Sequence, residues 1–427
     1  MTTNFTNHPL LPFMAEAVSN FLAVDAISRR LRDAGFTPLS ETDAWTLRPG
    51  DKRYVTKNGS AIFAFIVGSD ATAGARIIAA HSDSPGFRIK PNPEMLSAGM
   101  VKLNTEVYGG MIYSTWFDRP LGISGRVVVR GQDPLRPVHR LLRTDSVRLV
   151  IPSLAIHFNR QVNSGVALSA QKDLLPVLGA VNQSLQPSVM QIVARELGAA
   201  ADDILDFDLT LYDVQPPQLV GAAGDWVNCG RLDDLAMAWC ALDAVTAATP
   251  GKQTKIMAVF DNEETGSGTK QGAHSPVLRN IMRRVNLALG GSEEDWLRSV
   301  ADSFFISADC AHAAHPNYLE KMDPVNRPVL GGGPAVKVNA NCKYMTDADS
   351  AAVFAELCRL ADVPCQTFVN HSDSPGGSTL GNILTSQLDM RGVDMGVGLW
   401  AMHSCRETVS LADVDMTAKV FSRFYNL

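Results

Sequence analysis

The sequence predicts an α/β fold in which helices cover a mostly parallel sheet, with a separate β-rich domain inserted into it. In most of the chain, apolar strand-like runs alternate with amphipathic helical segments, which is typical of a parallel sheet. Between about residues 93 and 203 the alternation gives way to short β-like runs and turn residues. We therefore expect one domain built from residues 1–92 and 204–427, and an inserted domain of residues 93–203.

The first segment begins with a predicted helix from Phe13 to Ala34. Its apolar residues recur at helical spacing and Gly35 is a plausible stop. Residues 61–67 and 76–80 follow as predicted strands. The second strand runs directly into His81-Ser82-Asp83, so an apolar strand ends in residues that can bind a metal.

The inserted domain is predicted from runs at 101–108, 125–130 and 147–151, which show little helical periodicity. Pro216-Pro217 then marks a stiff loop back in the main domain. In the second segment the predicted helices are 232–247, 276–285, 292–301, 348–360 and 411–424. The predicted strands there are 255–260, 304–308, 366–369 and 397–401.

Composition limits the classes of function. The chain has 427 residues, is 46% hydrophobic and carries a net charge of −6. No block of lysine and arginine stands out, which argues against nucleic acid or an anionic membrane as a partner. No apolar run approaches the roughly 20 residues that span a bilayer. The first twelve residues do not resemble a secretory signal, and the seven cysteines form no CxxC pair, so we expect a reduced cytoplasmic protein.

The most informative stretch is Asp261-Asn262-Glu263-Glu264, which follows the apolar run 256–260. Adjacent carboxylates at a strand end raise each other's pKa, and a bound cation removes that cost. Neighbouring side chains of an extended segment diverge, so one glutamate can hold a metal while the other faces substrate as a general base. A solvated acidic turn is an equally good interpretation of this stretch alone.

Four candidate ligand sites fall at predicted strand ends and a fifth opens a helix: His81, the Asp261–Glu264 stretch, Asp309, His403 and Asp233-Asp234. Active sites of open α/β sheets lie beyond the carboxyl ends of the strands. Two histidines and three carboxylates converging there have the composition of a dinuclear metal site, with the metals ~3.5–4 Å apart. Nitrogen and oxygen ligands suit zinc, cobalt or manganese.

Each candidate also has an ordinary structural interpretation. His81 is compatible with a surface loop, although Asp83 is placed to accept its second ring N–H. Asp233 is compatible with a helix N-cap followed by a first-turn acid, Asp234. Asp309 suits a capped turn and His403 a buried, hydrogen-bonded histidine. Each ordinary interpretation is acceptable for one residue alone. An accidental occurrence of all five candidates at the correct places is much less probable.

At these residues the chain resembles the aspartyl aminopeptidases, which are dinuclear-zinc metallopeptidases. The matching motifs come in the family's order and cover nearly the whole chain. They are His81-Ser82-Asp83-Ser84-Pro85, Arg231-Leu232-Asp233-Asp234, Asp261-Asn262-Glu263-Glu264 with Gln271-Gly272-Ala273, the stretch Asp309 to Asn317, and Met402-His403-Ser404-Cys405-Arg406-Glu407. Thr265 and Gly268 depart from the commoner family residues but are not ligand positions.

The resemblance implies a zinc-peptidase-like fold and a set of roles. The terminal ligands of two zinc ions would be His81, Glu264, Asp309 and His403, with Asp233 as the bridge; cobalt or manganese are possible substitutes. Glu263 would be the general base, and Asp83 would orient His81. The hexapeptide His-Ser-Asp-Ser-Pro-Gly recurs at His371, where it aligns with a substrate loop of the family and not with a ligand.

Substrate contacts are also implied by the resemblance. Lys337 and Tyr344 match positions that contact substrate, and His157 matches a histidine that reaches a neighbouring subunit's active site. Their ordinary interpretations are a strand lysine, an aromatic at the edge of the core and a hydrogen-bonded histidine of the β domain. In the family the inserted domain makes the dimer contact, and dimers build a closed dodecamer.

The sequence therefore predicts a cytoplasmic metalloaminopeptidase that removes N-terminal acidic residues, Asp before Glu, from peptides. An acidic side chain needs a cationic or strongly donating pocket, because a carboxylate left unpaired in a dry site is costly. One alternative is a broad-specificity aminopeptidase or deacylase with the same metal site. Another is a catalytically silent, metal-stabilised scaffold, although an intact Glu263 beside a full ligand set argues against it.

Overall fold

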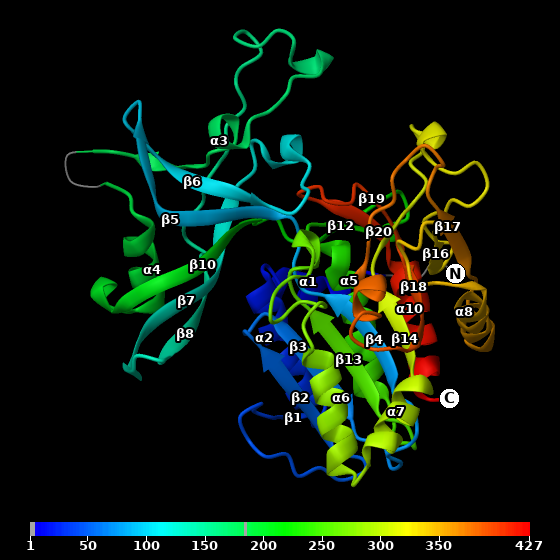
Figure 1. The fold of residues 1–427 in the computed structure, drawn as a ribbon. Helices are drawn as coiled ribbons and strands as arrows, with labels where there is room; N and C mark the ends of the chain where they lie inside the picture. The colour runs from blue at the N-terminus through cyan, green and yellow to red at the C-terminus, as the bar shows by residue number, and fades with distance from the viewer. Residues whose placement is uncertain (1–4, 183–185) are drawn as a thin grey trace. The chain divides into compact units, whose positions relative to one another are not determined.

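The computed structural model describes residues 5–182 and 186–427, which form two compact units (Figure 1). The first unit comprises Met1–Asp83, Pro217–Met402 and Glu407–Leu427, and the second comprises Ser84–Pro216 and His403–Arg406. The predicted insert, residues 93–203, lies inside the long segment of the second unit. Each unit has its own sheet and its own core, and they are described in turn.

The first unit is built on a nine-stranded sheet. In spatial order its strands are β1 (Thr37–Pro38), β2 (Lys52–Lys57), β3 (Ala61–Ile66), β13 (Lys255–Phe260), β4 (Arg76–His81), β14 (Phe304–Ala308), β18 (Arg391–Gly396), β16 (Ala335–Val338) and β17 (Gln366–Val369). The four consecutive strands β13, β4, β14 and β18 run parallel. The predicted helix-covered, mostly parallel sheet is confirmed.

Helices cover both faces of this sheet (Figure 1). The core on one face includes side chains of α1 (Leu10–Glu16), α2 (Asn20–Asp33), α5 (Leu232–Ala247), α8 (Ala348–Leu360) and α10 (Leu411–Tyr425). The core on the other includes α6 (Val277–Ala288), α7 (Glu293–Ala301) and α9 (Leu380–Leu384). Along β13, Met257 and Val259 enter the first core while Ile256, Ala258 and Phe260 enter the second. Burial on both faces is why this strand is a continuous apolar run.

A smaller, five-stranded sheet also belongs to the first unit. Its strands, in spatial order, are β11 (Gln218–Val220), β12 (Trp226–Cys229), β20 (Glu407–Ser410), β19 (Gly398–Trp400) and β15 (Ala311–His312). β12 leads directly into α5 and β20 directly into α10. This sheet therefore fixes where two of the covering helices begin.

The second unit contains a six-stranded sheet whose paired strands are all antiparallel. The spatial order is β8 (Arg136–Arg143), β7 (Leu121–Asp133), β10 (Ile204–Asp213), β5 (Gly86–Ser97), β6 (Met100–Tyr108) and β9 (Val177–Ala180). The short helices α3 (Ala170–Asp173) and α4 (Val189–Leu197) belong to the same unit. This unit has a core of its own, in which the fully buried side chains include Leu103, Ile123, Val127 and Leu209. The β-rich part of the predicted fold class is therefore present.

One predicted element is divided in the structure, and one strand was missed. The single helix expected from Phe13 to Ala34 is two helices, because Ser19 adopts an extended conformation and its hydroxyl accepts a hydrogen bond from Leu22 N, which caps α2. The strand expected at 397–401 is β19, whereas β18, which ends at Gly396 and belongs to the nine-stranded sheet, was not predicted. Apolar periodicity cannot show where a backbone changes sheets.

The prediction of a strand at 147–151 is wrong. Only isolated bridges occur there, between Leu121 and Leu149 and between Val150 and Val177. The two bridges join this segment to two different partners, so no continuous ladder forms. Leu149 and Ile151 are nevertheless buried, which explains the apolar pattern that suggested a strand.

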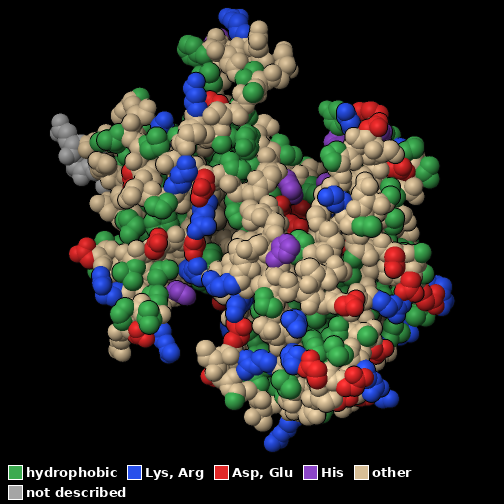
Figure 2. Space-filling view, viewed as in Figure 1, with side chains coloured by type: hydrophobic (Ala, Val, Ile, Leu, Met, Phe, Trp, Pro, Cys, Tyr) green, Lys and Arg blue, Asp and Glu red, His purple; other side chains and the backbone are tan. Residues whose placement is uncertain are grey.

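Charged side chains of both signs occur together on one face of the molecule (Figure 2). On the face shown in Figure 2, lysine and arginine side chains are interspersed with aspartate and glutamate. Among the residues that the structure describes, no helix combines the length and the apolar character needed to cross a bilayer.

Replacing Gly396 with alanine should destabilise the first unit. A Cβ at this position would meet Asp309 O at 1.9 Å and Cys310 Cα at 2.8 Å, and both are backbone atoms. We expect the free energy of unfolding in urea to fall by about 2 kcal/mol or more. Gly377→Ala is the control, because no atom lies within 4 Å of its Cβ position. Equal stability of the two variants would contradict this packing argument.

Candidate metal centre

The candidate site lies where three parallel strands of the first unit end. Phe260, at the end of β13, pairs with His81, at the end of β4. On the other side of β4, Ser307 of β14 pairs with Ala79. Residues that follow these strands, among them Glu263, Glu264 and Asp309, therefore start from the same edge of the sheet as His81. This is the edge at which open α/β sheets bind ligands.

Asp83 connects two of these strand ends. One of its carboxylate oxygens accepts a hydrogen bond from Glu263 N and the other from Glu264 N, both at 3.1 Å. Asp83 Oδ1 also lies 3.3 Å from His81 Nδ1, and its backbone oxygen lies 3.0 Å from the same nitrogen. The side chain thus holds the turn that carries both glutamates and contacts one side of the His81 ring, leaving Nε2 on the other side.

The start of α5 contributes two carboxylates. Asp233 Oδ1 lies 3.7 Å from His81 Nε2, and Asp234 Oδ2 accepts a hydrogen bond from His81 N at 3.0 Å. Glu407, which is 2% exposed, accepts a hydrogen bond from Asp233 N at 3.0 Å. Neither Asp233 nor Asp234 has helical φ and ψ. An N-cap residue also has extended φ and ψ, so this observation argues only against a first-turn role for Asp234.

Two overlapping groups of side chains in the first unit have the composition of a metal site. His81, Asp233, Asp234 and Asp309 each offer a ligand atom within 4.8 Å of the others, and so do His81, Glu263 and Glu264. The 3.7 Å between His81 Nε2 and Asp233 Oδ1 is too long for a hydrogen bond but suits two ligands at ~2 Å from one zinc ion. Asp234 Oδ1 is buried and accepts no hydrogen bond from the described residues. This donor set fits zinc.

The electrostatics of the site favour a bound cation. Burial, together with repulsion from neighbouring carboxylates, raises the pKa of Asp234 and Glu264 well above their ordinary values and that of Glu263 to about 8. Burial lowers the pKa of His81, but Asp234, Asp83 and Glu263 together raise it well above its usual value. A divalent cation relieves this crowding of like charges.

Comparisons with known proteins decide the family. A family model described as Aminopeptidase I zinc metalloprotease (M18) matches residues 13–425. The chain belongs to the M18 aminopeptidase family. It is 47% identical over 423 residues to a probable M18 family aminopeptidase 2 of Clostridium novyi (strain NT), with 98% of each chain covered. The predicted family is confirmed, and this M18 chain is a zinc aminopeptidase.

Solved structures agree on the fold. A chain in the cryo-EM structure of the Ape4 and Nbr1 complex aligns with a TM-score of 0.93 at 34% identity, covering 97% of this chain and 84% of that one. The S. cerevisiae mApe1 dodecamer structure aligns with a TM-score of 0.84 at 26% identity, covering 97% and 95%. This M18 aminopeptidase therefore shares the fold of these solved structures over nearly its whole length.

Lys337 contacts the candidate centre directly. Its ammonium lies 3.2 Å from Asp309 Oδ1, and the residue is 4% exposed. It also lies 5.7 Å from the centre of the Tyr344 ring. Burial alone lowers the pKa of Lys337, but the negative charge of Asp309 keeps the pKa above its usual value. The structure therefore brings together the two predicted substrate residues of the first unit and one predicted ligand.

His371 does not join the candidate metal groups. Its Nδ1 accepts a hydrogen bond from Asp373 N at 3.2 Å within its own loop. The residue lines a cavity of about 350 Å³ together with His312, Phe368 and Trp400. The second copy of the hexapeptide therefore lies in a loop, and the expectation that His371 supplies no ligand stays a prediction.

Sequence reasoning missed the contacts that two residues make at this site. Asp234 was grouped with Asp233 as a candidate site, with a first-turn acid as the alternative, but no contact was predicted for it; its carboxylate accepts a hydrogen bond from His81 N. Glu407 was quoted within a motif, yet it accepts the hydrogen bond of Asp233 N. A signal existed for Asp234, since it adjoins Asp233. The contact of Glu407 joins residues 174 apart in the chain, so no local pattern could show it.

His403 and His157 belong to the second unit. His403 has a left-handed φ of 67°, and its Nδ1 lies 2.9 Å from Gly110 O. Ile112 N donates a hydrogen bond to His403 O at 3.0 Å. His157 is exposed in the loop that follows Ile151. The ligand role of His403 and the cross-subunit role of His157 stay predictions.

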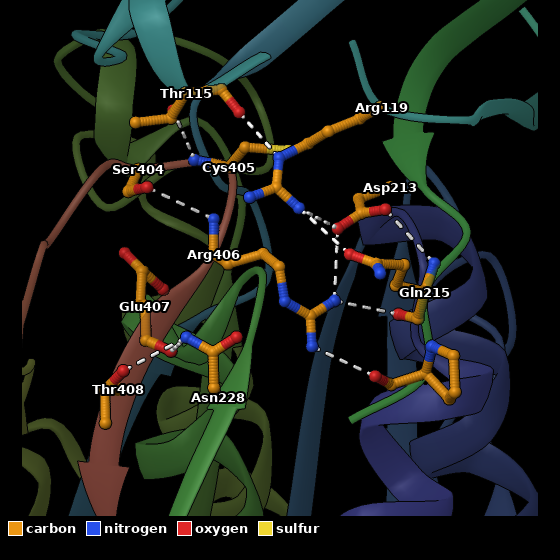
Figure 3. A network of polar contacts seen from close by, with 11 residues as sticks. Thr115, Arg119, Asp213, Gln215, Asn228, Ser404, Cys405, Arg406, Glu407 and Thr408 are labelled. Atoms are coloured by element: carbon orange, nitrogen blue, oxygen red, sulfur yellow. Dashed lines mark hydrogen bonds and ion pairs between the residues drawn. The ribbon is translucent and has the colours of Figure 1, made fainter. Parts of the chain in front are cut away.

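The four residues His403–Arg406 are held in the second unit by a buried ion pair (Figure 3). Arg406 Nη1 lies 3.1 Å from Asp213 Oδ2, and its guanidinium also donates to Gln215 O and Pro216 O. Thr115 Oγ1 accepts a hydrogen bond from Cys405 N. Arg119 reaches the same oxygen of Asp213. This network fixes the segment that carries His403.

Replacing Arg406 with methionine should destabilise the second unit strongly. The Arg406 and Asp213 side chains are 5% and 2% exposed, and breaking a buried pair costs about 3 kcal/mol or more. Arg119→Met is the matched control, because Arg119 contacts the same carboxylate but is 28% exposed. Its loss should cost less than about 1 kcal/mol. Urea unfolding at one protein concentration measures both, and equal losses would contradict the special role of Arg406.

Proposed function

We propose that this zinc aminopeptidase releases N-terminal acidic residues from peptides, Asp in preference to Glu. The observation that carries the proposal is the buried ammonium of Lys337, 3.2 Å from Asp309. A substrate carboxylate entering a site shielded from water needs a cation. An ammonium group has three N–H donors, so Lys337 can contact Asp309 and still donate to the substrate's side chain. Tyr344 beside it adds a hydroxyl donor.

The proposed ligands are those expected from the resemblance. His81, Glu264, Asp309 and His403 would be terminal ligands of two zinc ions, with Asp233 between them and with cobalt or manganese as substitutes. Zinc at such a site lowers the pKa of water and polarises a carbonyl group. The contacts of Asp83 with His81 Nδ1 support its role in orienting the ring so that Nε2 serves as the ligand.

Glu263 is the proposed general base. Its backbone is held by Asp83, and its side chain is partly exposed beside the ligand set. In the proposed reaction its carboxylate accepts a proton from the attacking water and delivers that proton to the leaving amine. Lys337 and Tyr344 hold the acidic side chain of the substrate meanwhile.

We also propose a homo-oligomeric assembly in the cytoplasm, built from dimers and reaching a dodecamer. A similar protein, mApe1 of S. cerevisiae, has been solved as a dodecamer. In the second unit the loop around His157 exposes Leu154, Ile156 and Phe158 at 63%, 52% and 82%, which suits a contact with another copy. The inserted domain, 93–203, would make the dimer contact and His157 would act across it. All seven cysteines are free thiols, as in a reducing compartment.

Glu263→Gln should leave the metal content unchanged and lower kcat by a factor of about 10² to 10⁴, because an amide cannot accept the proton of water. Zinc per chain is measured by elemental analysis and kcat with an aspartyl substrate. Glu41→Gln is the control, since Glu41 is an exposed glutamate paired with Lys57. Near-normal turnover in the Glu263 variant with zinc retained would rule out the general-base role.

Chelation should abolish hydrolysis, and zinc, cobalt or manganese should restore it. The test compares Asp-, Glu-, Leu- and Ala-linked substrates before chelation, after it and after each metal is returned. We expect metal-dependent activity on the Asp and Glu substrates only. Activity on Leu or Ala would keep the metal site but replace the specificity with that of a broad aminopeptidase or deacylase. Folded, metal-loaded protein with no turnover would favour the silent scaffold.

Lys337→Met should separate the two roles of this lysine. If the ammonium binds the substrate's acidic side chain, kcat/KM should fall by a factor of about 10² or more for Asp substrates and much less for Leu, because one buried charge contact is lost. If it only balances the charge of Asp309, all substrates should lose activity equally and zinc per chain should fall. Lys255→Met is a control, since Lys255 is a buried lysine that contacts Thr249 and Asn426 instead.

A further inference from the structure

A pair of cysteines lies at the end of α8, away from the residues discussed above. Cys358 is in the last turn of the helix and is 1% exposed. Cys365 is exposed and directly precedes β17. Between them the chain turns back: Val363 N donates a hydrogen bond to Cys358 O at 3.0 Å, and Asp362 has a left-handed φ of 53°. This turn returns Cys365 to the helix end that carries Cys358.

The two thiols are in contact. The side chain of Cys358 forms a hydrogen bond with that of Cys365, which raises the pKa of Cys358 and lowers the pKa of Cys365. Cys365 Sγ also lies 3.7 Å from Gln366 O. The exposed thiol is therefore the more acidic of the two, and the buried thiol lies beside it.

The other cysteines offer no such arrangement. All seven lie in described residues, and four of the remaining five, Cys229, Cys240, Cys310 and Cys405, are buried. Cys342 is exposed, but it lies beyond β16 in the turn where its backbone N–H bonds Asn339 O. Reactivity toward oxidants follows exposure and thiolate character, so the Cys358–Cys365 pair combines an accessible sulfur with a second sulfur in contact.

We propose that Cys358 and Cys365 form an oxidation site at which hydrogen peroxide converts two thiols into one disulfide. The Cys365 thiolate attacks one peroxide oxygen, the O–O bond breaks, and Cys365 becomes a sulfenic acid while hydroxide leaves and takes up a proton. The Cys358 sulfur then attacks the sulfenic sulfur, loses its proton and expels the hydroxyl group as water. Two thiols and one peroxide give one disulfide and two waters.

The disulfide would link the end of α8 to the start of β17. Gln366, the next residue, bonds Val329 N and O and Gly333 O through its side-chain amide. Gly333 N in turn donates to the buried carboxylate of Asp413 at 2.7 Å. The segment that the disulfide would restrain is therefore already packed in place, so oxidation requires little movement of the backbone and thiol reductants should reverse it.

The test uses the full-length protein and does not depend on the proposed peptide specificity. The reduced protein is treated with hydrogen peroxide at equimolar to ten-fold excess, then alkylated and digested without reductant. We expect a cross-linked peptide containing Cys358 and Cys365, a mass loss of two hydrogen atoms per chain and the loss of two titratable thiols. Dithiothreitol should restore both thiols.

Three variants assign the roles. In Cys358→Ser, Cys365 should be captured by dimedone as a sulfenic acid. In Cys365→Ser, Cys358 should remain reduced. Cys342→Ser is the matched control and should form the cross-linked peptide at the wild-type rate. Oxidation of Cys342 before Cys365, or over-oxidation of Cys365 in the wild-type protein without a cross-linked peptide, would overturn the proposal. Because the wild-type result decides the outcome, a variant that fails to fold does not affect it.

Discussion

A single buried carboxylate, that of Asp83, organises the candidate metal centre of this M18 aminopeptidase. It accepts hydrogen bonds from the backbone N–H groups of Glu263 and Glu264 and contacts the Nδ1 side of His81. A carboxylate that is 2% exposed is costly to bury unless donors surround it. These donors come from the segment after β13, so satisfying Asp83 fixes two strand ends relative to each other. The positions of the candidate ligands that follow these two strands depend on that contact.

Balance of charge is the second constraint. The first unit places His81, Asp233, Asp234 and Asp309 within 4.8 Å of one another, with Glu263 and Glu264 adjoining. Lys337 supplies one positive charge from β16, and a metal bound here would supply more. The polar contacts that shape this centre reach across the chain: Glu407 holds Asp233 N, and Asp234 holds His81 N. An enzyme built in this way keeps its acids in place by backbone hydrogen bonds, so that their outward oxygens remain available as ligands.

The second unit satisfies its buried charges in a different way. Asp213 and Arg406 neutralise each other inside it, with carbonyl oxygens taking up the remaining guanidinium donors (Figure 3). This arrangement meets the requirement that a buried ion pair have its remaining hydrogen bonds satisfied. It concerns the four residues His403–Arg406, which return to this unit from far along the chain. Residues of the motif Met402 to Glu407 therefore make contacts in both units. Arg406 pairs with Asp213 in the second unit, and Glu407 accepts a hydrogen bond from Asp233 N in the first.

By itself the sequence determined the fold class, the family and the strand ends at which the ligand-type residues occur. It did so because strand and helix periodicity, and short motifs such as Asp261-Asn262-Glu263-Glu264, are local properties. Only the tertiary structure decided that Lys337 contacts Asp309, that Asp234 and Glu407 support the site, and that Cys358 meets Cys365. It also decided that the chain passes from the nine-stranded sheet to the five-stranded sheet between β18 and β19. These outcomes depend on contacts between residues distant in the chain, or on the turn of a backbone, and such contacts leave no periodic signal in the sequence.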